Sequence, residues 1–133
     1  MARLTDEQKQ FLEQPFVGVA TTIRPDGCPH NTVVWVDLED GVIAFNTAYG
    51  RAKPRHLEQN PRAGVIVVDP NDVFKWVSVE GPAELTTEGA DAQIDKLAKK
   101  YLGKDEYPWR NPEERRVKVR ITPEHLTSSG FGS

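Results

Sequence analysis

The chain has 133 residues, of which 38% are hydrophobic and 28% charged, with a formal net charge of -3. This length suits a single domain, which we expect to span residues 1–133 and to bury a real core. Net acidity argues against general nucleic-acid binding, which needs a broad basic face, and no apolar run is long enough to cross a bilayer.

The start of the chain shows no secretory signal, because polar helix-forming sequence begins within the first few residues. The single cysteine, Cys28, cannot form an internal disulfide, which is typical of a reducing compartment, and we expect a cytoplasmic protein. Cys28 lies in a turn beside Gly27 and has no identifiable activating base, so we favour an inert thiol over a nucleophile.

The first predicted elements are a short helix and a β-hairpin. Thr5-Asp6-Glu7-Gln8 is a capping box that predicts a helix to about Gln14. Residues 16–23 are rich in β-branched side chains and predict a strand. The turn signal Pro25-Asp26-Gly27 then leads into a second strand over residues 30–38.

The segment over residues 45–63, FNTAYGRAKPRHLEQNPRA, carries the chemistry that stands out most. An apolar strand over residues 42–45 ends in Asn46-Thr47, and a turn then leads into a helix whose start carries the cations Arg51, Lys53 and Arg55. A helix N-terminus attracts anions through its unpaired N–H groups and its dipole. To such a site an arginine adds a planar fork of hydrogen-bond donors, and a lysine adds a compact positive charge. This segment predicts a site for a phosphate monoester.

The second half of the chain predicts further strands around one helix. Residues 64–68 are an apolar run, expected to be a strand buried on both sides. Residues 74–85 predict a long strand in which Gly81-Pro82 marks a bulge or an edge position. Helical spacing predicts a helix from residue 88 to residue 102, ended by Gly103.

The last predicted elements are two strands, and they complete the fold class. Residues 116–121 alternate strictly, which predicts one wet basic face and one buried face, and a short final strand is expected near Leu126. Six or seven strands with antiparallel connections and two or three helices predict a mainly β fold, a small antiparallel barrel with helices.

The order of these motifs resembles the pyridoxamine 5′-phosphate oxidase-like split-barrel family, and more narrowly its actinobacterial branch of deazaflavin (coenzyme F420) oxidoreductases. The resemblance covers about residues 11–121. It implies a six-stranded antiparallel split β-barrel, an obligate homodimer and two cofactor sites at the dimer interface. The motifs that carry it are PDGxPH, a strand with Trp35, a strand ending in FNT, GRAKxRHLxxNPRA, DP, VxVEGPAEL and a helix with KYLG.

The resemblance also implies which residues would bind the cofactor. The phosphate would face the GRAK motif, with Arg51 and Lys53 on either side of Ala52. Trp76 would approach the ligand across the dimer interface. The ring system would lie along one strand, formed by Asn31, Thr32, Val33, Val34 and Trp35.

Several of these residues also have a plain structural interpretation. The Thr47 hydroxyl suits a phosphate oxygen, but β-propensity explains it equally well. Trp35 and Trp76 are equally typical of core or dimer packing. Asn31 and Thr32 are either partners of the cofactor's pyrimidine-like edge or ordinary strand residues.

The sequence departs from the vitamin oxidase at two points. Ala52 separates an arginine and a lysine that are adjacent in that enzyme, and no C-terminal segment with arginine and histidine is present. Oxidation of pyridoxamine phosphate is therefore not expected. The Arg-x-Lys spacing is similar to that of the deazaflavin branch, in which Arg55 would be a neighbour for the cofactor's anionic tail.

Three functions remain open. The leading hypothesis is an F420-dependent oxidoreductase that transfers a hydride between the deazaflavin and a small unsaturated organic substrate. The second is a flavin reductase or oxidase that binds flavin mononucleotide (FMN), and the third is a non-catalytic dimeric protein that binds or stores the cofactor. No catalytic residue is assigned. The loop Tyr107-Pro108-Trp109 would line the substrate side, and His30 and His56 lack metal-ligand spacing, so no metal is expected.

Overall fold

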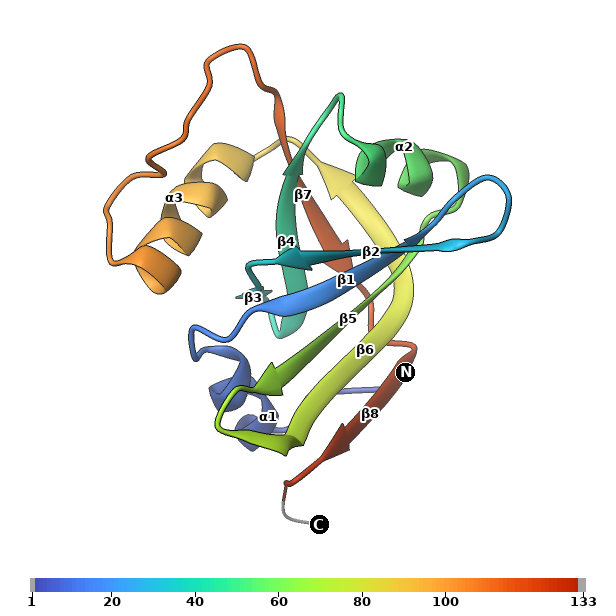
Figure 1. Ribbon diagram of the computed structural model, residues 1–133, viewed down its shortest axis with the longest axis vertical. Coiled ribbons are helices and arrows are strands. Elements are labelled where there is room, and N and C mark those ends of the chain that lie inside the picture. Colours follow the sequence, from blue (N-terminus) through green and yellow to red (C-terminus); the bar gives the residue numbers. More distant parts are fainter. Residues whose placement is uncertain (1, 132–133) are drawn as a thin grey trace.

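The computed structural model describes residues 2–131, which form three helices and eight strands (Figure 1). The helices are α1 (Asp6–Leu12), α2 (Ala52–Gln59) and α3 (Ala90–Leu102). The strands are β1 (Gly18–Ile23), β2 (Pro29–Val34), β3 (Asp37–Glu39), β4 (Val42–Ala48), β5 (Arg62–Asp69), β6 (Asp72–Thr86), β7 (Arg116–Ile121) and β8 (His125–Ser129).

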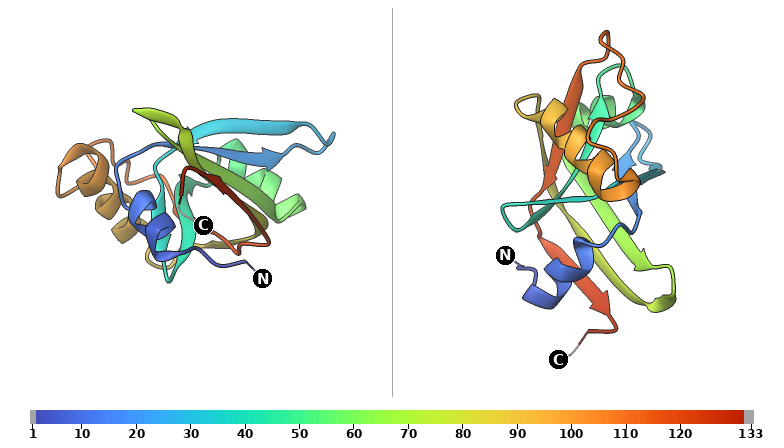
Figure 2. Two further views of the ribbon diagram at one scale, coloured as in Figure 1. Left: turned by 90° about the horizontal axis from the view of Figure 1, so that it is seen from below. Right: turned by 90° about the vertical axis from the view of Figure 1, so that its left-hand side faces the viewer.

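The strands form one curled antiparallel sheet in the order β2-β1-β5-β6-β7-β4-β3, with β8 paired to β6. The two end strands of this path, β2 and β3, are joined only by Trp35 and Val36, so the two ends of the sheet come together at this point and the sheet curls into a split barrel. Figure 2 shows the resulting shape, with helices at the periphery of the barrel. The predicted mainly β, antiparallel fold is confirmed.

The eight strands exceed the six or seven that the sequence pattern predicted and the six that the resemblance implied. Six strands have at least six residues, and the two additional ones, β3 and β8, have three and five. The short final strand near Leu126 was predicted, and it is β8. The predicted strand over residues 30–38 is divided instead, because at Trp35 and Val36 the chain leaves one half of the sheet for the other.

The local signals at the helix ends are confirmed. The backbone N–H of Gln8 donates to the Thr5 hydroxyl at 3.1 Å, and the Thr5 N–H donates to the Gln8 side chain at 2.9 Å, which is the predicted capping box. Helix α3 ends at Gly103, whose φ of 71° lies in the left-handed region that favours glycine.

The long strand β6 connects the two halves of the barrel. Its first part pairs with β5 and β8, and its last residues pair with β7. Of the two alternatives predicted at Gly81-Pro82, the bulge is not present, because no register shift occurs there; these two residues lie between the segment of β6 that pairs with β8 and the segment that pairs with β7. Gly81 instead marks a close crossing, because a Cβ atom at this position would overlap the Thr122 carbonyl oxygen and lie 3.0 Å from the Glu124 nitrogen.

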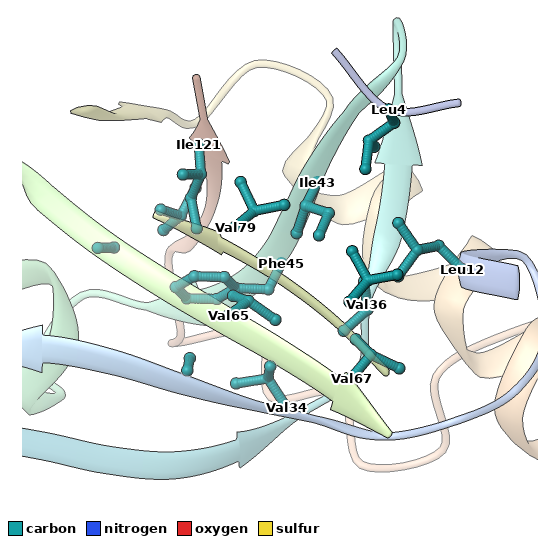
Figure 3. Packing of buried hydrophobic residues seen from close by; sticks show 14 of the residues in the cluster. Leu4, Leu12, Val34, Val36, Ile43, Phe45, Val65, Val67, Val79 and Ile121 are labelled. Atoms are coloured by element: carbon teal, nitrogen blue, oxygen red, sulfur yellow. The ribbon is translucent and has the colours of Figure 1, made fainter. Parts of the chain in front are cut away.

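The core lies inside the barrel, around Phe45, which is fully buried (Figure 3). Alternate residues of the strands point inward, among them Val65 and Val67 of β5. The expectation that this strand is buried on both sides is wrong for the single chain: Ile66 faces outward and is partly exposed. On this outer face of β5, Ile66 lines a groove at the surface of the chain.

Helix α3 is fixed to the barrel at the division between β2 and β3. The ammonium group of Lys100 donates to the carbonyl oxygens of Leu12 and Val36, each at 2.7 Å. The Tyr101 hydroxyl accepts from the Val36 N–H at 2.9 Å and donates to the Phe16 carbonyl at 2.7 Å. Burial lowers the pKa of Lys100 to about 8 and raises the pKa of Tyr101 to about 12.

The lowered pKa of Lys100 predicts a pH dependence of stability. Between pH about 8 and 10.5 the unfolded chain binds the Lys100 proton more tightly than the folded chain does. The free energy of unfolding contributed by Lys100 should therefore rise with pH across this window. Denaturant unfolding of the wild type and of Lys100→Met tests this, and the advantage of the wild type should grow as the pH rises. A difference that does not vary with pH would contradict the prediction.

Candidate functional site

A cavity of about 210 Å³ lies where β2, β4, the start of α2, α3 and the loop after α3 meet. Five of the sequence-predicted site residues line it, namely Val33, Val34, Trp35, Arg51 and Lys53. The β2 residues reach it because the strand ends there at the edge of the sheet. The two cations reach it because the turn after β4 starts α2 at the same end of the barrel.

Two cations from the start of α2, Arg51 and Lys53, line this cavity. The Lys53 ammonium donates to the Thr32 hydroxyl at 3.0 Å, so Thr32 of the predicted set contacts the site through Lys53. Burial, and secondly the nearby charge of Arg51, lower the pKa of Lys53. Arg51, the N-cap residue of α2, has a half-exposed side chain that donates to a Glu114 carboxylate oxygen at 2.9 Å. Two positive charges thus converge at a position open to a ligand.

Aromatic side chains form a further part of the lining, namely Trp35, Tyr107 and Trp109. Trp35 stacks on Tyr101, with ring centroids 5.4 Å apart and planes inclined by 7°, and it meets the edge of Tyr107 at 6.0 Å. Trp109 adds a further edge contact to Tyr107 at 5.6 Å. The predicted loop at residues 107–109 therefore does border the cavity.

One carboxylate positions this aromatic loop. Asp95 of α3 accepts from the Tyr107 backbone N–H at 2.9 Å and from the Arg110 guanidinium at 2.6 Å. The bond from Tyr107, followed by the bond and charge of Arg110, lowers the pKa of Asp95. The loop is thus fixed to the helix by charge-assisted hydrogen bonds.

The other predicted residues lie outside the cavity. Ala52 follows Arg51 in α2 but does not line the site, and the Asn31 side chain accepts from the Thr21 hydroxyl at 2.6 Å. Thr47 is buried, and its hydroxyl has no hydrogen-bond partner within residues 2–131. Trp76 lies on β6, paired with Val68 and Ser129, so one chain does not bring it to the two cations.

Sequence reasoning missed several lining residues, of which Arg116 is the most important. The alternation of β7 predicted a wet basic face, but the Arg116 side chain is 7% exposed. It donates to Asn46 at 3.3 Å and to Glu114 at 3.1 Å, and its guanidinium lies 4.9 Å from the Tyr107 ring centre. The alternation does not distinguish Arg116 from Lys118 and Arg120, which lie on the same face of β7 and are partly exposed, so no local signal would have found it.

The two histidines of this region are close together but do not form a metal site. His56 is buried with its Nδ1 2.8 Å from the Thr22 hydroxyl, and its ring centre lies 5.1 Å from that of His30. Desolvation and neighbouring cations lower the pKa of both rings. Within residues 2–131, no group of three or more histidine, cysteine or acidic side chains is arranged to hold a metal ion. No helix there is long and apolar enough to span a membrane.

Comparison with curated proteins finds relatives with redox functions. The chain is 29% identical over 129 residues to the F420H(2)-dependent biliverdin reductase of Mycobacterium tuberculosis, covering 96% of this chain and 89% of that protein. It is 30% identical over 114 residues to the pyridoxine/pyridoxamine 5′-phosphate oxidase of Bacteroides thetaiotaomicron. That match covers 85% of this chain and 47% of the oxidase. The chain therefore spans about half the length of that relative.

The solved structures and the family comparison agree with these relatives. A structure described as an F420 reductase superposes with a TM-score of 0.79 at 26% identity, over 93% of this chain and 98% of that one. The sequence profile described as pyridoxamine 5′-phosphate oxidase matches residues 4–129. Because this match spans nearly the whole chain and the fold agrees with it, the chain belongs to the pyridoxamine 5′-phosphate oxidase family and has its split-barrel fold.

Proposed function

We propose that this chain is an F420-dependent oxidoreductase that reduces a small unsaturated organic molecule. The observation that carries this proposal is one cavity lined both by the cations Arg51 and Lys53 and by the apolar strand residues Val33 and Val34. This arrangement suits a flat ring system with a phosphate. The similarity to the F420H(2)-dependent biliverdin reductase, which extends over 89% of that protein, supports the deazaflavin as the cofactor.

The residues present fit such a cofactor chemically. Lys53 has its ammonium held at the Thr32 hydroxyl, and Arg51 offers a planar guanidinium that matches a phosphate. Val33 is 68% exposed where it lines the cavity, and a flat ring bound there would cover it and remove apolar surface from water. The cavity of about 210 Å³ is smaller than the roughly 300–1,000 Å³ of typical ligand sites. One chain would therefore enclose only part of the cofactor.

The protein's part in the reaction is to bind, orient and shield. When bound, the reduced deazaflavin would supply the hydride. Arg51 and Lys53 would hold its phosphate and so fix the position of the ring along β2. Tyr107 and Trp109 would exclude water from the side on which the acceptor approaches.

We also propose that the chain works as a homodimer. The outer face of β1, β5 and β6 has a groove of about 510 Å³. Val19, Ile66 and Trp76 on these strands are all at least partly exposed in the single chain. Burying this face against a second copy would remove apolar surface from water. It would also place Trp76 at the interface, as the family resemblance implies.

The second candidate is an FMN-dependent flavin reductase or oxidase. The 30% identity to the Bacteroides oxidase favours it, and FMN also ends in a phosphate that Arg51 and Lys53 would bind. The anionic tail distinguishes the two cofactors, because only F420 extends beyond the phosphate. Arg55, which is exposed on α2 outside the cavity, would serve the tail alone.

One set of titrations tests the proposed function. The purified protein is titrated separately with F420 and with FMN while the fluorescence of its three tryptophans is followed. We expect saturable quenching by F420, and then turnover of a quinone, an enone or a nitroaromatic compound with the reduced cofactor. Tight FMN binding without a response to F420 would favour the second candidate. Binding without turnover would favour a storage protein, and a monomer in sedimentation would contradict the dimer.

A further inference from the structure

A single carboxylate bridges two arginines that line the cavity. One oxygen of Glu114 accepts from Arg51 at 2.9 Å, and the other accepts from Arg116 at 3.1 Å. Both arginines line the cavity, whereas Glu114 does not. The two guanidinium groups are therefore directed at one anionic group, and that group belongs to the chain itself.

The two arginines differ in how firmly they are held. Arg116 is buried, donates also to Asn46, and has its guanidinium close to the Tyr107 ring. The Arg51 side chain is 51% exposed, and it donates a hydrogen bond to the Glu114 carboxylate. An exposed pair of this kind is weak, because water screens the charges. A ligand anion would therefore compete for Arg51 more easily than for Arg116.

The charges around the cavity support such competition. Arg51, Lys53 and Arg116 contribute three positive charges, and the Glu114 carboxylate offsets one of them. Guanidinium groups bind carboxylates and phosphates through the same paired hydrogen bonds. A ligand phosphate or carboxylate would thus have the same partners as Glu114 has.

We propose that Arg51 and Arg116 form an anion site that Glu114 occupies in the free protein, and that an anionic group of the ligand replaces it. The inference rests on the proposed function, since it assumes a phosphate-bearing cofactor in this cavity. Glu114 is then an internal competitor. It lowers the affinity for the anionic ligand, and it leaves the affinity for neutral ring systems unchanged.

The test compares Glu114→Gln with the control Glu113→Gln. Glutamine keeps the shape of Glu114 and removes its charge. Glu113 is exposed, and its backbone N–H, not its carboxylate, contacts Asn111. Both variants are titrated with FMN and F420, and with riboflavin and the deazaflavin chromophore without phosphate. We expect Glu114→Gln to bind at least one of the anionic cofactors roughly two- to tenfold more tightly, with the control and the neutral chromophores unchanged.

Each result has a definite meaning. A gain for both cofactors identifies the phosphate as the group that replaces Glu114, and a gain for F420 alone identifies the carboxylates of its tail. Unchanged or weaker binding of both cofactors would overturn the inference, and so would an equal gain for the neutral chromophores. If the wild type binds neither cofactor, it is the proposed function that fails.

A structure of the wild-type complex provides an independent check. With the cofactor bound, the hydrogen bond between Arg51 and Glu114 should be absent, and Arg51 should contact an anionic group of the ligand. A complex in which Glu114 still bridges Arg51 and Arg116 would overturn the inference even if the affinities change.

Discussion

Replacement of Lys53 by methionine should weaken binding of the phosphate-bearing cofactor roughly ten- to a hundredfold. A charge-assisted hydrogen bond to a phosphate contributes about 1.5–3 kcal/mol. Methionine keeps the apolar stem of this half-buried side chain but cannot donate to Thr32 or to the ligand. Fluorescence titration of both proteins with the cofactor that the wild type binds measures the change in the dissociation constant.

The matched control for Lys53 is Arg55→Met on the same helix. It removes one positive charge from an exposed position outside the cavity. We expect FMN binding to change little in Arg55→Met. We also expect Lys53→Met to bind the chromophores that lack a phosphate with the same affinity as the wild type. Equal weakening of FMN binding by the two variants would show that only the overall charge of α2 matters, and the assignment of Lys53 to the phosphate would then be wrong.

The second large effect concerns stability: Gly81→Ala should lower the free energy of unfolding by about 3 kcal/mol or more. The added Cβ would overlap the carbonyl oxygen of Thr122 and press against the Glu124 backbone. Both are main-chain atoms, so relief would require the strands to move. The Glu124 N–H also donates to the Glu80 carbonyl at 3.0 Å, and the Thr122 N–H donates to the Pro82 carbonyl at 2.9 Å. A shift of the chain here would weaken both bonds.

Denaturant unfolding at matched protein concentration measures this loss, with Gly64→Ala as the control. Gly64 lies on the neighbouring strand β5, opposite Glu80, and a Cβ there would meet the flexible Glu80 side chain at 3.1 Å. This contact can be relieved by a rotamer change, so the cost should be much smaller. Similar losses in the two variants would contradict the explanation by backbone overlap.

The two cations of the site have different roles in these proposals. Lys53 is half-buried, and its ammonium is already placed by Thr32, so it would be ready for the phosphate in the free protein. Arg51 is held by Glu114 and must exchange partners before it can bind a ligand. Removing Lys53 should therefore cost affinity, whereas removing the charge of Glu114 should increase it. Opposite signs from two positions close to Arg51 make the combined result informative.

The local elements of this protein were predictable from the sequence. The capping box before α1, the hairpin of β1 and β2 and the glycine that ends α3 were all predicted and are present. Each of these signals acts between residues a few positions apart. Backbone geometry and side-chain propensity are therefore sufficient to determine them. The cations at the start of α2 could be recognised for the same reason.

The neighbours of each site residue were decided only by the tertiary structure. Lys53 meets Thr32, which is 21 positions away, and Arg51 meets Glu114, which is 63 positions away. The burial of Arg116 depends on contacts with Asn46 and Tyr107 from other elements. Period-two alternation in β7 reports only which face of the strand a residue occupies, and not what covers that face. The sequence by itself thus determined the elements and the clustered cations, whereas the closure of the barrel determined which charges meet.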